Sequence, residues 1–174
     1  MSKKYVIGVD LGGTKIAAAL CGDRCEILSK IKTETRAEEG EESVVERIKG
    51  AIREVAAHSG VGLDEVSGIG ISSPGPLSVS QGVVLYAATL GWENVPIRDL
   101  IQGEFNIPAY LENDANVAAF GEKCLGAGKG RDDLIYVTVS TGIGSGIITG
   151  GKIYHGKHDA AGEFGHICIE RGGR

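Results

Sequence analysis

The spacing of apolar residues changes within the first sixty positions of the chain. Three short apolar runs are interpreted as strands, at residues 5–9, 15–21 and 25–31. Glycine-containing turns at residues 12–13 and 22–23 separate them, so we expect an antiparallel meander. In residues 43–59 apolar positions recur every three or four residues, which predicts an amphipathic helix ending at Gly60.

Farther along the chain, strand-like and helix-like segments alternate. Further strands are expected at residues 66–72, 83–86, 108–111 and 134–139. Helices are expected at residues 97–105 and 115–125, and residues 90–96 are interpreted as a turn that carries the only tryptophan, Trp92. The predicted apolar side of the last helix consists of Val117, Phe120, Cys124 and Leu125.

The order of elements at the start of the chain returns at residue 134. A strand, a glycine turn at residues 140–144, a second strand and a second turn follow one another, which predicts an internal duplication. The expected lobes are residues 1–130 and 131–174, the second being incomplete. Facing glycine turns in duplicated βββαβα units are typical of the α/β actin-like ATPase or sugar-kinase fold, whose lobe is ribonuclease H-like.

Composition narrows the classes of partner. The 174 residues carry a net charge of −5 without a basic cluster, which argues against nucleic acid and membrane surfaces as partners. No window reaches the length of a transmembrane span, so a cytoplasmic protein is expected. The four cysteines are scattered and do not predict a disulfide framework. The 28 glycines imply many tight turns, and small ligands are the expected partners.

The glycine turn behind the first strand combines groups that suit a metal-chelated phosphate. Gly12 and Gly13 let backbone N–H groups approach a bound anion, while Thr14 and Lys15 add a hydroxyl and a positive charge. Asp10 would repel a phosphate unless a divalent cation stood between them, so the turn suits a Mg²⁺-nucleotide. The alternative interpretation is a simple β-hairpin turn, and both interpretations can hold together.

Two further polar groups invite a functional and a structural interpretation. Asp114, after Asn113 at a strand-to-helix junction, is either a helix cap or a general base that takes a proton from a substrate hydroxyl. Glu163 and His166 can hydrogen-bond adjacent sugar hydroxyls, and His166 can ligate zinc; the structural alternative is a solvated loop.

Six ordered motifs together resemble the ROK family of bacterial sugar kinases and repressors, and within it the glucokinase pattern. They span essentially the whole chain and lie at residues 10–15, 73–76, 90–92, 112–119, 141–146 and 161–166. The resemblance implies ATP-dependent phosphorylation of a hexose, with glucose to glucose 6-phosphate as the first expectation. Fructose, allose and N-acetylmannosamine are alternative acceptors, and a non-catalytic sugar-binding or regulatory protein is the alternative from another class. A homodimer is expected.

The resemblance also implies a role for each matching position. Asp10 would hold Mg²⁺, and Asp114 would be the catalytic base. The positions that would cradle the ATP phosphates are Gly12, Gly13, Thr14, Lys15, Thr141 and Gly142. The positions that would bind the sugar are Gly75, Asn113, Asp114, Glu163 and His166. His166 would also ligate a structural Zn²⁺ in the family pattern.

Three departures from the family pattern change these expectations. Thr89 stands where the glucokinase pattern has asparagine, which leaves the preferred hexose open. Ser140 stands where glycine is common, and the family's zinc cysteines are absent from this sequence, so the remaining ligands of His166 are missing. We therefore expect a truncated chain, inactive or weakly active when expressed alone.

Overall fold

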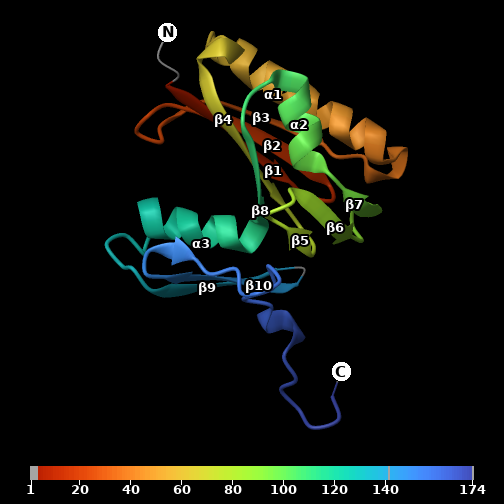
Figure 1. The fold of residues 1–174 in the computed structure, drawn as a ribbon, viewed down its shortest axis with the longest axis vertical. Coiled ribbons are helices and arrows are strands. Elements are labelled where there is room, and N and C mark those ends of the chain that lie inside the picture. The colour runs from red at the N-terminus through yellow and green to blue at the C-terminus, as the bar shows by residue number, and fades with distance from the viewer. Residues whose placement is uncertain (1–3, 141, 174) are drawn as a thin grey trace. The chain divides into compact units, whose positions relative to one another are not determined.

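Residues 4–140 and 142–173 are described by a computed structural model, and the contacts among them separate the chain into two units (Figure 1). The first unit is Met1–Asn113 and the second is Asp114–Arg174. The predicted lobe boundary at residue 130 falls inside the second unit, because the preceding helix contacts the strands that follow it. The division into lobes at that residue stays a prediction.

A five-stranded sheet forms the centre of the first unit, in the order β3-β2-β1-β4-β8 (Figure 1). Its strands are β1 (Tyr5–Leu11), β2 (Lys15–Cys21), β3 (Ile27–Glu34), β4 (Val66–Ser73) and β8 (Ala109–Asn113). The first three strands are antiparallel, which confirms the predicted meander, and β4 and β8 run parallel to β1. The carboxyl ends of β1, β4 and β8 therefore lie at one edge of the sheet.

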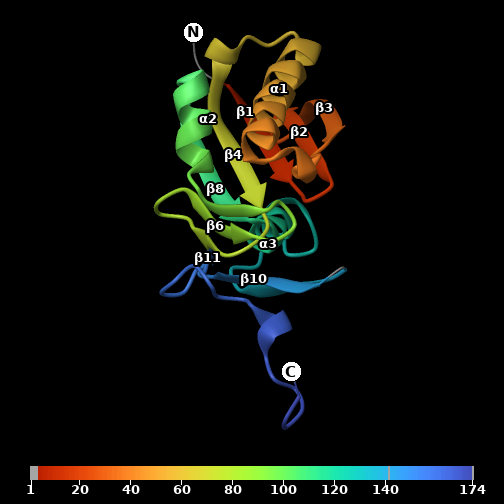
Figure 2. The ribbon, with the colours of Figure 1, turned by 90° about the vertical axis from the view of Figure 1, so that its right-hand side faces the viewer.

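Two helices cover one face of this sheet, α1 (Glu41–Ser59) and α2 (Ile97–Phe105) (Figures 1 and 2). Both were expected from the spacing of apolar residues. Their buried side chains, such as Ile48, Ile52 and Ile101, share one core with the inward residues of β1. Burial of each isoleucine contributes roughly 1.5–3 kcal/mol, which fixes the face that each strand turns inward.

Ion pairs also tie the two helices to each other. Glu104 of α2 forms an ion pair with Lys49 Nζ of α1 at 3.2 Å. It forms a second ion pair with Arg53, which also belongs to α1. The guanidinium of Arg53 lies 5.4 Å from the ring centroid of Phe105. These contacts lie outside the buried core and help to fix the orientation of α2 relative to α1.

A small antiparallel sheet stands between β4 and α2 in the sequence. It consists of β5 (Leu77–Ser78), β6 (Val83–Ala87) and β7 (Trp92–Val95), in that order. The expectation that residues 90–96 form only a turn was wrong, because β7 pairs with β6 and buries Trp92 to 1% exposure. A strand of four residues is too short to show a hydrophobic period.

The second unit packs one helix on a three-stranded sheet of order β11-β10-β9. Its elements are α3 (Asp114–Leu125), β9 (Leu134–Val139), β10 (Ile143–Thr149), β11 (Lys152–Ile153) and the 3₁₀ turn η3 (Phe164–His166). The predicted apolar side of α3 was wrong. The large residues Val117, Phe120, Cys124 and Leu125 are exposed, and the buried residues are Ala115, Asn116 and Ala119.

The small size of the contacting residues explains which face of α3 is buried. A methyl group placed on Gly146 of β10 would lie 2.6 Å from both the carbonyl oxygen of Ala115 and Cβ of Ala119. Helix and strand therefore approach more closely than larger side chains allow, and the contact selects the alanine face over the bulkier one. Hydrophobic size alone pointed to the opposite side.

Gly146→Ala is expected to destabilise the second unit by about 1–3 kcal/mol, because backbone atoms surround the added methyl group. The readout is amide hydrogen exchange of β10. Gly144→Ala is the matched control in the same strand, since its methyl group would meet only side-chain atoms, at 3.2 Å from Thr138 Cγ2 and 3.5 Å from Ala115 Cβ. Equal losses of protection in both variants would contradict the close helix–strand contact.

Among the residues that the structure describes, no helix combines the length and the apolar composition needed to cross a membrane.

Candidate active site

The parallel strands bring polar side chains to one edge of the first unit. Asp10 of β1 pairs in register with Ser72 of β4, and the neighbouring Ser73 pairs with Asn113 of β8. The hydroxyl of Ser72, which is 6% exposed, donates to Asp10 Oδ1 at 2.8 Å. The carboxylate of Asp10 is thereby oriented while its residue stays exposed to solvent.

The glycine turn between β1 and β2 is closed by hydrogen bonds of its own. Gly12 N donates to the carbonyl of Lys15 at 2.9 Å, so this amide is already used. The buried Thr35 donates its hydroxyl to Gly12 O at 2.6 Å and its amide to Thr14 O at 3.0 Å. In the described part of the chain, the amides of Gly13 and Thr14 have no acceptor. The turn is a hairpin with two N–H groups left for an anion.

Gly13 is also the point at which the turn meets another loop. A methyl group on Gly13 would lie 2.7 Å from Cβ of Thr89, so only glycine fits there without displacement. Thr89, one of the positions at which this sequence departs from the glucokinase pattern, therefore borders the turn at residues 12–15, named the phosphate turn after its predicted role. Spacing along the sequence gave no indication of this contact, because 76 positions separate the two residues.

Gly75, predicted to contact a sugar, lies in the loop after β4 with φ of 93°. A methyl group on it would lie 2.0 Å from the carbonyl oxygen of Tyr86 in β6. Its positive φ and its close approach to β6 both require glycine. The structure thus gives Gly75 a role in shaping the loop, and its contact with a sugar stays a prediction.

Asn113 ends β8, and Asp114 is the next residue and the first of α3. One carboxylate oxygen of Asp114, Oδ1, accepts from Ala115 N at 2.7 Å. The structural interpretation of Asp114 as a group that binds a first-turn amide is therefore correct. The residue is also exposed to solvent.

The remaining predicted residues belong to the second unit. Gly142 is exposed and directly precedes β10, whereas Thr141 lies outside the described residues. Glu163 Oε2 is 3.8 Å from Nε2 of His166, and both side chains are largely exposed. Two glycines hold this segment against β10: a methyl group on Gly162 would lie 2.5 Å from Ser145 O, and the same holds for Gly165 and Ile143 O.

Ser145 was missed by sequence reasoning. It is 4% exposed, and its hydroxyl donates a short hydrogen bond to the carbonyl of Gly162. This bond fixes the segment that carries Glu163 to the middle of β10. The residue lies inside the motif at residues 141–146, but that motif assigns it no role, so only the fold reveals its partner.

Zinc does not fit the residues present. Within residues 4–140 and 142–173 no group of three or more histidine, cysteine, aspartate or glutamate side chains is arranged to hold a metal ion. His166 has an 82% exposed side chain, and Cys168 donates its thiol to the carbonyl of Glu170. All four cysteines are free thiols.

Comparison with known proteins places these features in a family. The ROK family model matches residues 6–174. The chain is 37% identical to a glucokinase from Thermotoga maritima, covering 99% of this chain and 53% of the relative. It is 35% identical to a xylose repressor from Caldicellulosiruptor bescii, covering 94% of this chain and 41% of the relative.

A solved ROK glucokinase from Streptomyces griseus, in complex with glucose and AMPPNP, superposes with a TM-score of 0.85 at 38% identity, covering 95% of this chain and 51% of that one. The chain spans about half the length of the curated relatives it matches. The expected α/β fold of the actin-like ATPase class is confirmed by these neighbours. The chain belongs to the ROK family.

Proposed function

We propose that this chain is the phosphate-binding and sugar-binding part of an ATP-dependent hexose kinase, with glucose as the first expected acceptor. The observation that carries the proposal is the sheet edge at Asp10, where an oriented carboxylate stands beside a closed glycine turn with two unused amides. Support comes from the glucokinase relatives, one of which binds glucose and AMPPNP.

The residues at this edge fit Mg²⁺ with a nucleotide. Ser72 occupies one oxygen of Asp10, and the other oxygen has no partner among the described residues, so it can accept from a water of a hydrated Mg²⁺. The amides of Gly13 and Thr14 and the side chains of Thr14 and Lys15 can donate to phosphate oxygens. When bound, ATP would supply the phosphoryl group, and the Mg²⁺ would neutralise part of the negative charge of the phosphates.

The chain's own residues then position and deprotonate the acceptor. Asp114 would accept the proton of the sugar's 6-hydroxyl as that oxygen forms a bond to the γ-phosphorus, while the bond from the γ-phosphorus to the bridging oxygen breaks and ADP leaves. Asn113, Glu163 and His166 bind the remaining hydroxyls and hold the acceptor in line. Catalysis of this kind depends mainly on positioning and on electrostatic stabilisation of the transferred group.

A sugar-responsive regulator is the second candidate, because xylose repressors match the chain about as closely as glucokinases do. A repressor requires sugar binding without phosphoryl transfer. The two functions therefore differ in a single measurable property, which is turnover of ATP in the presence of sugar.

The test uses a chimera that joins this chain to the part of the Thermotoga maritima glucokinase that the chain does not cover. Coupled assays with glucose, fructose, allose, N-acetylmannosamine and xylose are expected to show ATP-dependent phosphorylation, fastest with glucose. The relative's own complete enzyme is the control for the assay. A folded chimera that binds sugar without turning over ATP would overturn the kinase proposal in favour of the regulator.

A further inference from the structure

A groove of about 530 Å³ lies at the free edge of the sheet in the first unit. It is lined by Lys15, Lys32, Thr33, Glu34, Arg36 and Arg47, from β2, β3, the segment after β3, and α1. Four of the six lining side chains are cationic, in a protein whose net charge is −5. Such a local reversal of charge attracts anions.

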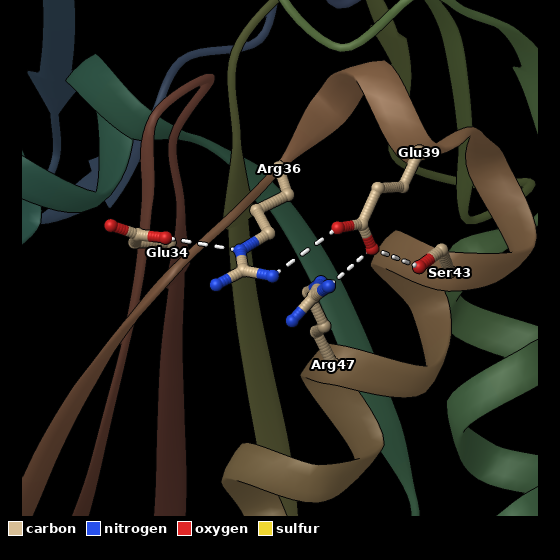
Figure 3. A network of polar contacts seen from close by, with 5 residues as sticks. All are labelled: Glu34, Arg36, Glu39, Ser43 and Arg47. Atoms are coloured by element: carbon tan, nitrogen blue, oxygen red, sulfur yellow. Dashed lines mark hydrogen bonds and ion pairs between the residues drawn. The ribbon is translucent and has the colours of Figure 1, made fainter.

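Two of these cations are held in place by carboxylates (Figure 3). Arg36 Nε donates to Glu34 at 3.0 Å, and its Nη1 donates to Glu39 at 3.4 Å. Arg47 Nη2 donates to the other oxygen of Glu39, which also accepts from Ser43 Oγ at 2.9 Å. These bonds fix the direction of both guanidinium groups.

The pKa of Glu39 is held below its usual range, first by the hydrogen bond from Arg47 and then by those from Ser43 and Arg36. Glu39 therefore stays ionised at neutral pH. Glu34 and Glu39 together carry two negative charges. The four cations that line the groove therefore keep an excess of two positive charges.

Unused donors remain in the groove. In the described part of the chain, neither Lys15 nor Lys32 forms an ion pair. Two ammonium groups without an ion pair, beside two guanidinium groups held in fixed directions, form a set of donors that suits an oxyanion.

We propose that this groove, defined by its six lining residues, is a second anion site that binds a phosphate group. Phosphate fits because it presents several acceptor oxygens and up to two negative charges to donors that come from different directions. The group can come from inorganic phosphate, alone or in a short chain, or from a phosphorylated sugar. The site shares only Lys15 with the phosphate turn, and it does not depend on the proposed kinase activity.

The test is a titration of the ¹⁵N-labelled, 174-residue chain at low salt, followed by amide chemical shifts. Inorganic phosphate, tripolyphosphate and glucose 6-phosphate are the three probes. Saturable shifts are expected at residues 32–36 and at Arg47. Tighter binding of tripolyphosphate would identify an inorganic chain as the ligand, and tighter binding of glucose 6-phosphate would identify a sugar phosphate; either order supports the site.

Two variants distinguish binding at this site from nonspecific electrostatic attraction of anions to the protein surface. Lys32→Gln is expected to weaken binding about fivefold, because an unpaired charge beside the anion is lost. Lys30→Gln is the matched control, since Lys30 lies two residues away on the same face of β3 but does not line the groove. Binding that both variants weaken equally, or an absence of saturable shifts at the groove in the folded chain, would overturn the proposal.

Discussion

Asp114→Asn is expected to lower kcat of the chimera by about 10²- to 10⁴-fold, the usual contribution of a general base. The substitution removes the proton acceptor and keeps the size and shape of the side chain. An asparagine at this position keeps the side-chain oxygen that accepts from Ala115 N at 2.7 Å, so the start of α3 is preserved. The amide oxygen can still accept a hydrogen bond from the sugar, so KM for the hexose should change little.

Two measurements separate this base from a purely structural aspartate. A coupled assay gives kcat, and thermal unfolding gives the stability of the same preparation. If Asp114 only supports the helix, Asp114→Asn will retain turnover, whereas Asp114→Ala will lose stability because the acceptor of the Ala115 amide is gone. Near-normal turnover of Asp114→Asn would reject the assignment.

Asp10→Asn is expected to reverse the effect of Mg²⁺ on nucleotide binding. In the wild-type chain Asp10 repels phosphate and attracts the metal, so affinity for ADP should rise when Mg²⁺ is added. In the variant, affinity for Mg²⁺-ADP should fall about 10- to 100-fold, the range seen for groups that orient a metal's ligands. Affinity for metal-free ADP should increase, because the repulsion is removed.

Isothermal titration with and without Mg²⁺ measures both quantities on the 174-residue chain. Ser72→Ala is the matched control, since it removes the 2.8 Å hydrogen bond to Asp10 but leaves the charge. Its loss should be only about fivefold, corresponding to one hydrogen bond, and metal-free binding should not improve. Parallel changes of both affinities in Asp10→Asn would show that this carboxylate does not face the metal-phosphate.

Much of the fold was predictable in segments where apolar residues recur at a regular spacing or where turn residues mark the ends of an element. The range predicted for α2, residues 97–105, matches Ile97–Phe105, and the range for β9 matches Leu134–Val139. Failures occurred where tertiary contact outweighed hydrophobic size. The alanine face of α3 is buried because Gly146 admits it, and β7 forms because β6 is available as a partner.

The candidate site was predictable in its residue types and less so in its details. The residue types of Asp10 and the glycine turn were enough to predict a site for a metal-chelated phosphate, which stays a prediction. That Gly12 N would be used by Lys15, or that Thr89 would touch Gly13, depends on how the hairpin closes and on a loop far away in sequence. Single hydrogen bonds of this kind leave no periodic signal.

Thr35 gives the phosphate turn a property that its glycines alone would not provide. An isolated glycine segment adopts many backbone conformations, and ordering it on ligand binding costs conformational entropy. Here the buried Thr35, the residue directly after β3, donates to Gly12 O and Thr14 O, so most of that ordering is completed when the sheet folds. For a nucleotide bound at this turn as proposed, affinity should depend on the integrity of β3, so conditions that open this edge strand should weaken phosphate binding before the protein unfolds.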